Sequence, residues 1–383
     1  MTFSNVSFGD VTDNFDKKRI PLSAAQREKR QGKYRYYGAQ GVIDWVDDYI
    51  FDGTYLLIAE DGENLKSKKS NIAQLASGKF WVNNHAHVIQ CKKGYDIRYL
   101  CYLINLTDLS GYITGSAQPK LSQSSMNAIV LPMPKFEIQK EVADFIEKFD
   151  KKIQINEKVN DNLQQQAAAI FRSWFVDCAP FGGKAPDEWE NVTLEDITAL
   201  VSRGITPKYA DDTDQIVINQ KCIRNHTIDL SLARTHTPKI INEKWLRFGD
   251  LLINSTGDGT LGRAAQVWFQ PKNLTVDSHV TIARPAKENL IFYIGLWGIL
   301  HEKEIESLHT GSTGQTELPR DRVKAMELLL PDNETLDRFN GLITPMAAAI
   351  VANQEENNRL AALRDAILPK LMSGEIDVTD IQL

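Results

Sequence analysis

Apolar and polar residues alternate with a helical period over a long stretch in the middle of the chain, residues 137–175. Apolar residues and two asparagines recur there in steps of three and four, which places them along one stripe of a helix. The same stripe returns 197 residues later, and five of its seven positions hold the identical residue. The two stripes consist of Ile153, Asn156, Asn160, Leu163, Ala167, Ile170 and Trp174, and of Ile350, Asn353, Asn357, Leu360, Arg364, Ile367 and Leu371.

The repeated stripe predicts two long helices that pack on each other. One copy alone would suit an ordinary amphipathic helix, but a repeat that keeps both asparagines favours a coiled-coil seam, in which buried asparagines fix the register. We expect Asn156 to face Asn353 across this seam. Helices of this length span roughly 55–60 Å, which is wider than a small domain. They are therefore expected to act as a spacer.

The second helix is expected to be less regular than the first, because it contains Pro345 and Pro369. Proline lacks the backbone N–H and its ring clashes with the preceding turn. We predict a short helix over 333–340 and a main helix over 345–368, followed by a distorted turn before Gly374.

Shorter pairs of similar segments extend the duplication to the rest of the chain. These pairs are Phe3–Asn14 with Trp189–Leu200, Leu56–Gly62 with Leu251–Gly257, and Val82–His85 with Val276–His279. A linker rich in proline and glycine, residues 179–186, stands between the two copies. We predict globular domains at 1–135 and 179–332, long helices at 136–178 and 333–376, and a tail at 377–383.

The two globular segments combine strand-like and helix-like stretches. The strand-like stretches are Tyr55–Glu60, Phe80–Val82, His87–Cys91, Asp250–Asn254 and Ala264–Phe269, and the helix-like ones are Ile97–Leu106 and Ile291–Leu300. The predicted fold class is α+β, with two globular domains separated by two long helices. The simplest packing of such an internal repeat is pseudo-twofold, with the two helices antiparallel.

Composition describes an ordinary globular chain, with 42% hydrophobic and 25% charged residues. No apolar run is long enough for a membrane span, so a cytoplasmic protein without membrane contact is expected. The net charge of −6 resides in the two helical segments. Any contact with nucleic acid must therefore come from local patches of positive charge. The four cysteines lack metal-binding spacing and are expected to be buried thiols.

One such patch is the run from Lys17 to Arg35, which contains eight basic residues and one acid. Aromatic residues follow and interleave with it, at Tyr34, Tyr36 and Trp45. This combination suits contact with phosphates and entry into a DNA groove, while a solvated charged face explains the run about equally well.

Catalytic motifs are absent from the sequence. Residues 257–262 satisfy the glycine pattern of a dinucleotide site, but a strand-like stretch follows instead of a helix, which predicts a simple turn. Of the pair His85 and His87, only His85 has a histidine counterpart in the second copy, which favours polar or core contacts over metal binding. The chain is therefore expected to hold no catalytic residue, cofactor or metal.

The order of these features resembles the specificity subunits of type I restriction-modification systems. The resemblance rests on YYGAQG at Tyr36–Gly41, the segment joining domain to helix at Gly115–Pro134, the long first helix, and LPKLMSGEI at Leu368–Ile376. It implies that each globular domain reads one half of a split site in double-stranded DNA. It also implies that the helices set the gap and dock two methyltransferase subunits, which bring S-adenosylmethionine. Restriction subunits would bring translocation and cleavage with ATP and Mg²⁺.

The resemblance also directs attention to side chains that could contact DNA. Arginine and lysine can pair with phosphate or guanine, and asparagine with adenine. The candidates in the first domain are Lys17, Lys18, Arg19, Arg27, Lys29, Arg30, Lys33, Arg35, Lys66, Lys68, Lys69, Asn84 and His85. Those in the second domain are Arg203, Lys208, Lys221, Arg224, Asn225 and Arg263.

Two other functions are compatible with parts of the sequence. A coiled-coil adaptor whose two domains bind proteins would suit the acidic net charge, but not the basic and aromatic run. A self-contained methyltransferase or nuclease would need the motifs that are missing.

Overall fold

The computed structural model describes residues 2–115, 118–257, 259–311 and 316–381. Two residues of the predicted joining segment, 116 and 117, and Asp258 of the glycine motif lie outside the described residues. The chain forms two compact units, one made of residues 1–152 with 359–383 and the other of residues 153–358. Each unit contains a globular part and a portion of both long helices. No helix in the described ranges combines the length and apolar character that crossing a bilayer requires.

The two long helices are α6 (Phe136–Phe175) and α10 (Asn333–Ser373). The first confirms its prediction. The second is one continuous helix, so the expected break at Pro345 is wrong. Pro345 and Gly341, four residues earlier, are both exposed, so water can reach the carbonyl that the proline leaves without an N–H partner. Pro369 is exposed in the same way.

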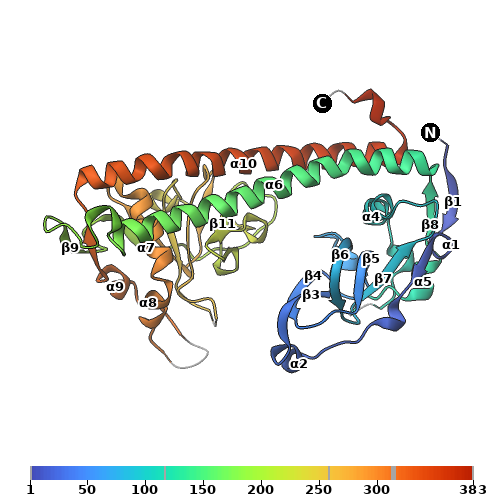
Figure 1. The fold of residues 1–383 in the computed structure, drawn as a ribbon, viewed down its shortest axis with the longest axis horizontal. Coiled ribbons are helices and arrows are strands. Elements are labelled where there is room, and N and C mark those ends of the chain that lie inside the picture. Colours follow the sequence, from blue (N-terminus) through green and yellow to red (C-terminus); the bar gives the residue numbers. More distant parts are fainter. Residues whose placement is uncertain (1, 116–117, 258, 312–315, 382–383) are drawn as a thin grey trace. The chain divides into compact units, whose positions relative to one another are not determined.

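Within the second unit α6 and α10 lie side by side and antiparallel (Figure 1). Asn156 Nδ2 donates to Asn357 Oδ1 at 2.8 Å, and Asn353 Nδ2 donates to Asn160 Oδ1 at 2.8 Å. The expected pairing of Asn156 with Asn353 is therefore wrong. The two helices run in opposite directions, so the first asparagine of each stripe faces the second asparagine of the other stripe.

The remaining seam residues are also buried or half-buried along both helices. In the second unit Leu163, Ile170 and Trp174 pack against the core that contains Ile350. In the first unit Leu371 belongs to the core, and Leu360 and Ile367 pack against it. The polar exception in the second stripe, Arg364, donates to Asp150 of α6 at 2.6 Å.

The first unit is built on a six-stranded sheet with the order β2-β7-β5-β6-β3-β4. The strands are β2 (Thr12–Asn14), β3 (Gln31–Gly38), β4 (Gly41–Val46), β5 (Phe51–Ala59), β6 (Ala73–Val82) and β7 (Ala86–Cys91). Its helices, besides α6 and α10, are α1 (Phe8–Val11), α2 (Ala24–Glu28), α3 (Asn64–Ser67), α4 (Ile97–Leu106) and α5 (Gln123–Asn127). Only β3 and β6 pair in parallel within this sheet, among the strands that the structure describes.

Hydrophobic clusters bury both faces of this sheet. One cluster joins sheet residues such as Leu56 to Leu100 of α4, Ile146 of α6 and Leu371 of α10. The other is rich in aromatic residues and includes Phe80, whose ring stacks on Phe51 with centroids 5.5 Å apart. The long helices therefore contribute directly to the core of the domain.

The second unit has smaller sheets. One has the order β10 (Thr198–Arg203), β18 (Val280–Pro285), β15 (Leu251–Asn254) and β16 (Ala264–Gln266), and another has β14 (Arg234–Thr235), β11 (Ile216–Ile218) and β17 (Leu274–Val276). A separate hairpin is formed by β12 (Ile223–Arg224) and β13 (Thr227–Ile228). The helices are α7 (Ile291–Leu300), α8 (Glu302–Ser307) and α9 (Arg320–Lys324). Strands β15 and β16, which flank the glycine motif, pair in antiparallel fashion, so the strand that the sequence predicts after the motif is confirmed.

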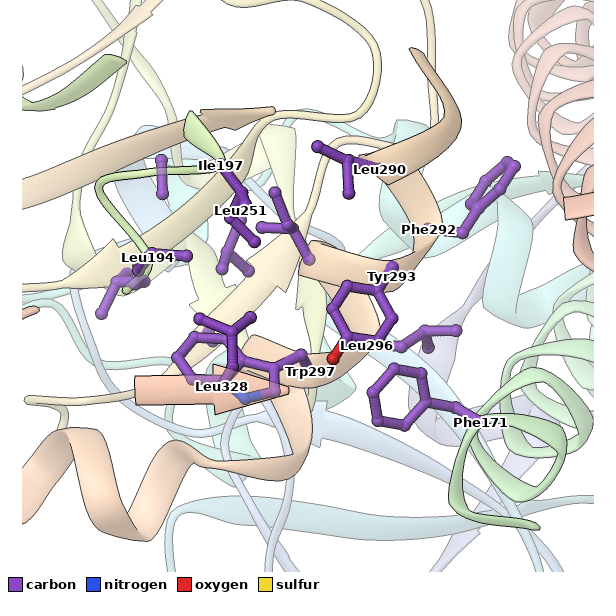
Figure 2. Packing of buried hydrophobic residues seen from close by; sticks show 14 of the residues in the cluster. Phe171, Leu194, Ile197, Leu251, Leu290, Phe292, Tyr293, Leu296, Trp297 and Leu328 are labelled. Carbon is purple, nitrogen blue, oxygen red and sulfur yellow. The ribbon is translucent and has the colours of Figure 1, made fainter. Parts of the chain in front are cut away.

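The core of the second unit gathers around α7, which is buried on nearly all sides (Figure 2). The ring centroids of Tyr293 in α7 and Phe171 in α6 lie 5.6 Å apart, and the two side chains face each other in Figure 2. A Cβ on Gly298 would lie 2.3 Å from Leu251 Cδ2, so only glycine permits this approach of helix to sheet.

The duplication in sequence is also a duplication of strand pairing. Strand β1 (Ser4–Ser7) pairs with β8 (Val130–Met133), and β9 (Glu190–Thr193) pairs with β19 (Glu327–Leu330) in the corresponding register. The segments that lead from each globular part to its long helix make equivalent hydrogen bonds. Leu121 N–H donates to Glu60 O at 2.8 Å, and Leu318 N–H donates to Ser255 O at 2.8 Å. The sheets between these shared elements differ. The α+β fold class is confirmed.

Candidate nucleic-acid interface

Part of the basic run in the first domain is used in contacts within the domain. Arg19 is largely buried, and its guanidinium donates to Glu60 Oε2 at 2.8 Å and to Ala86 O at 2.8 Å. Arg27 donates to Asp44 Oδ2 at 2.8 Å. Because these guanidinium groups already have acceptors, their main role is to hold the N-terminal segment on the sheet.

Several cations of the run form cation–π contacts with aromatic rings of the domain. Arg27 lies 5.1 Å from the ring centre of Tyr36, and Arg30 lies 4.9 Å from that of Trp81. Lys18, Lys33 and Arg35 make similar contacts with neighbouring rings. Such contacts orient cations at a surface without neutralising them.

Three other lysines of the first domain are available to an anion. The side chains of Lys17, Lys29 and Lys69 are exposed and make no hydrogen bond or ion pair with any residue that the structure describes. Lys66 and Lys68 instead donate to backbone carbonyls, at 3.0 and 2.8 Å. The predicted basic set therefore divides into bound and available cations.

In the second domain the candidates are also divided. Arg203 forms an ion pair with Glu317 and donates to Leu318 O at 2.8 Å. Arg263 is half-buried. The exposed candidates are Lys208, Lys221 and Arg224.

The tip of the β12–β13 hairpin lies against α6. Asn225 and His226 both have positive φ, at 50° and 61°, and both line a cleft of about 420 Å³ together with Gln164 of α6. His226 Nδ1 lies 3.2 Å from Glu302 Oε1, and this contact raises the pKa of His226. The structure thus places Asn225 beside the spacer helix within the second unit.

The two histidines of the first domain have different surroundings. Asn84 and His85 lie in the exposed turn between β6 and β7, and His85 Nδ1 lies 2.8 Å from Asp61 Oδ2. His87 is buried, with Nδ1 2.5 Å from Asp16 Oδ2 and Nε2 2.8 Å from Leu121 O. The expected polar or core role is confirmed for His87.

Asp16, Glu60 and His87 form a group whose ligand atoms lie within 4.8 Å of one another. Burial raises the pKa of Asp16, but hydrogen bonding and charge from His87, with further hydrogen bonds, outweigh it and leave the pKa below its ordinary value. Glu60 is already bonded to Arg19 and lies 3.2 Å from Lys120 Nζ. With two cations at this carboxylate, the group suits an internal ion-pair network better than a metal.

The four cysteines are free thiols, as expected. Burial raises the pKa of Cys91 and of Cys101 to about 12, and that of Cys222 to about 11. These thiols stay protonated at neutral pH, so they are poor nucleophiles and poor metal ligands.

Two features lie outside the predicted set of site residues. His279, the counterpart of His85 in the repeat, is exposed. Arg284 and Asp250 form a buried ion pair with two hydrogen bonds, at 2.8 and 2.7 Å, for which the sequence offered no local signal.

Known proteins provide an independent comparison. The family described as "Type I restriction modification DNA specificity domain" matches residues 2–165. The MjaIX specificity subunit of Methanocaldococcus jannaschii is 26% identical over 359 residues, covering 85% of this chain and 80% of that protein. The HindI specificity subunit of Haemophilus influenzae is 22% identical over 457 residues, covering 98% and 95%.

A solved structure has the same fold. The crystal structure of a type I restriction-modification S subunit from M. genitalium aligns with a TM-score of 0.57 at 12% identity, covering 97% of this chain and 96% of that one. Fold and sequence relatives agree over nearly the whole length. Residues 2–165 therefore match the type I restriction-modification DNA specificity domain, and over most of its length the chain is similar to type I specificity subunits in sequence and in fold.

Proposed function

We propose that this chain reads a DNA site in two separate halves, with one globular domain for each half. The similarity to type I specificity subunits supports a DNA specificity subunit without catalysis of its own. The main support for a DNA site read in two halves is the duplicated strand pairing, of β1 with β8 and of β9 with β19, around unequal sheets. Two similar domains with different reading surfaces suit a site whose halves differ in sequence.

The long helices act as a coiled-coil spacer that fixes the gap between the half-sites, in a pseudo-twofold arrangement. The asparagine pairs support this role, because a polar pair within an apolar seam disfavours any shift in register. A slip of one helix turn would leave only one asparagine pair and place the other two asparagines against apolar positions of the seam, at the cost of their hydrogen bonds.

Catalysis and its cofactors belong to partner subunits in this proposal. Two methyltransferase subunits dock on the helices and bring S-adenosylmethionine, while restriction subunits bring ATP and Mg²⁺. The complex acts on double-stranded DNA in the cytoplasm. Because the chain carries a net charge of −6, the partners supply much of the affinity for phosphate.

The available cations suit a positioning role on the DNA backbone. The side chains of Lys17, Lys29 and Lys69 are exposed and make no hydrogen bond or ion pair within the described ranges. Replacing them together with glutamine should reduce the salt dependence of DNA binding by the methyltransferase complex, by roughly 0.9 in log–log slope per phosphate contact. The methylated sequence should stay the same. Lys184, an exposed lysine in the linker that pairs with Asp187, is a matched control.

The deciding experiment is methylation mapping across the genome of a host without its own methylation, expressing this chain with its methyltransferase subunit. A single split motif with a methyl group in each half is the expected result. A folded and assembled complex that methylates nothing would contradict the proposal and favour an adaptor. Exchanging residues 1–135 for those of a relative should change one half of the motif only.

A further inference from the structure

The two domains present a histidine in the same hydrogen-bonded frame. In the first domain His85 N–H donates to Asn83 Oδ1 at 2.8 Å, and His85 O accepts from Glu60 N–H at 2.9 Å. In the second domain His279 N–H donates to Asp277 Oδ1 at 2.9 Å, and His279 O accepts from a backbone N–H at 2.8 Å. Both side chains are exposed, that of His85 by 47%.

Each ring is also oriented through the same nitrogen. His85 Nδ1 lies 2.8 Å from Asp61 Oδ2, and His279 Nδ1 lies 2.8 Å from Thr256 Oγ1. The Asp61 carboxylate can only accept. The Thr256 hydroxyl donates its proton to Gln220 Oε1 at 3.0 Å, so it too accepts from the ring. In both domains the proton on Nδ1 is used internally, and Nε2 is the atom left for an external partner.

The charges around the two frames differ. Around His85 they are Asp61, Glu60, Arg19 and Lys120, the last pairing with Glu60 at 3.2 Å.

Around His279 they are Asp277, Glu317 and Arg203, and Glu317 stands at the position that Lys120 holds in the first domain. The histidine is therefore kept although Asp61 is replaced by Thr256 and Lys120 by Glu317 at the corresponding positions. An exposed ring contributes little to stability, so packing alone gives no reason for this.

We propose that His85 and His279 are equivalent contacts to the DNA backbone, each donating from Nε2 to a phosphate of its own half-site. The argument rests on the proposed two-part reading of DNA. The bases of the two half-sites differ, so a residue shared by both domains should contact a feature that both half-sites share. With Nδ1–H donated internally, Nε2 carries a proton only in the imidazolium form, which is the form that an anionic oxygen binds.

A dependence on pH follows, with a definite sign. Protonated rings add two positive charges to the interface, so DNA binding is expected to be tighter and more sensitive to salt at about pH 6 than at about pH 8. Going from about pH 6 to about pH 8 should lower the log–log salt slope by roughly 0.9 for each histidine. The same loss is expected on cognate and unrelated duplexes, because phosphates carry no sequence information.

The test uses the full chain assembled with its methyltransferase subunit, and measures binding of both duplexes over a range of KCl at the two pH values. His85→Gln and His279→Gln should each remove about half of the pH-dependent change in slope, and the double variant should remove it. His309→Gln, an exposed histidine outside the frame, is the matched control. A double variant that keeps the full pH-dependent change would overturn the proposal.

Two further outcomes would also overturn it. If either variant changes the methylated motif in one half, the ring reads a base. If the variants fail to assemble with the methyltransferase subunit in the absence of DNA, the ring contacts that partner. Methylation mapping of the wild-type complex tests the two-part reading separately, so the failure of one proposal is distinguishable from the failure of the other.

Discussion

Replacing the asparagines of the helix seam tests both the packing and the register of α6 and α10. Asn156 is 3% exposed and donates to Glu356 at 2.7 Å and to Asn357 at 2.8 Å. In Asn156→Leu these hydrogen bonds are lost and Asn357 loses its partner. A half-buried amide without its hydrogen-bond partner lowers the free energy of unfolding by about 1–3 kcal/mol. The single variant should therefore be less stable than the wild type.

The double variant Asn156→Leu/Asn357→Leu should recover this loss. Both asparagines of the pair are then gone, so only the half-buried Glu356 loses a hydrogen bond, and each leucine contributes up to about 1.5–3 kcal/mol where it is buried. A coupling of roughly 2 kcal/mol or more between the two sites is expected, since residues in direct contact are not additive. Calorimetry of the chain should show a Tm several degrees lower for the single variant, and equal or higher for the double.

The control is Asn358→Leu, at an exposed neighbouring position, which should change stability by less than about 0.5 kcal/mol. If the single and double variants shift Tm additively, the two asparagines do not face each other and the reasoning fails. Methylation by the complex provides a second readout. A seam without this polar pair should permit more than one register, so the double variant is expected to methylate motifs with more than one gap length.

Three further changes test other parts of the fold. Arg284→Met leaves the buried Asp250 carboxylate unpaired and should lower the free energy of unfolding by roughly 3–5 kcal/mol in urea. Since the pKa of Asp16 is lowered by folding, its contribution is present above the ordinary value of 3.8 and lost as pH falls through the lower folded value. His87→Leu or Asp16→Asn should therefore flatten the acid limb of the plot of Tm against pH. Pro345→Ala restores a helical N–H at an exposed site and should raise stability by up to about 3 kcal/mol, measured by circular dichroism during thermal unfolding.

Local patterns predicted the elements of this protein well. The helices α4 and α7 begin and end at the predicted residues, and the strand-like stretches fall on β5, β6, β7, β15 and β16. These elements are determined by periodicity within a few residues of sequence, so tertiary context had little to change. The last strand was predicted too long, because β16 ends at Gln266.

The resemblance to type I specificity subunits and the duplicated plan also followed from the sequence, because repeats and their order survive even when individual motifs are loose. The sequence did not show which cations could reach DNA. Arg19 and Glu60 are 41 residues apart in sequence, yet their contact removes Arg19 from the available set. Lys17, two residues earlier, is exposed.

The residue pattern was enough to specify the α+β class, the two long helices and the position of the seam, and it contains no catalytic motif. Folding settles which asparagines meet, whether the helix continues through Pro345, and which histidines face outward. The physical reason is the range of the interactions. Helical stripes are set by residues three and four apart, whereas hydrogen-bond partners and exposure depend on chain segments that only folding brings together.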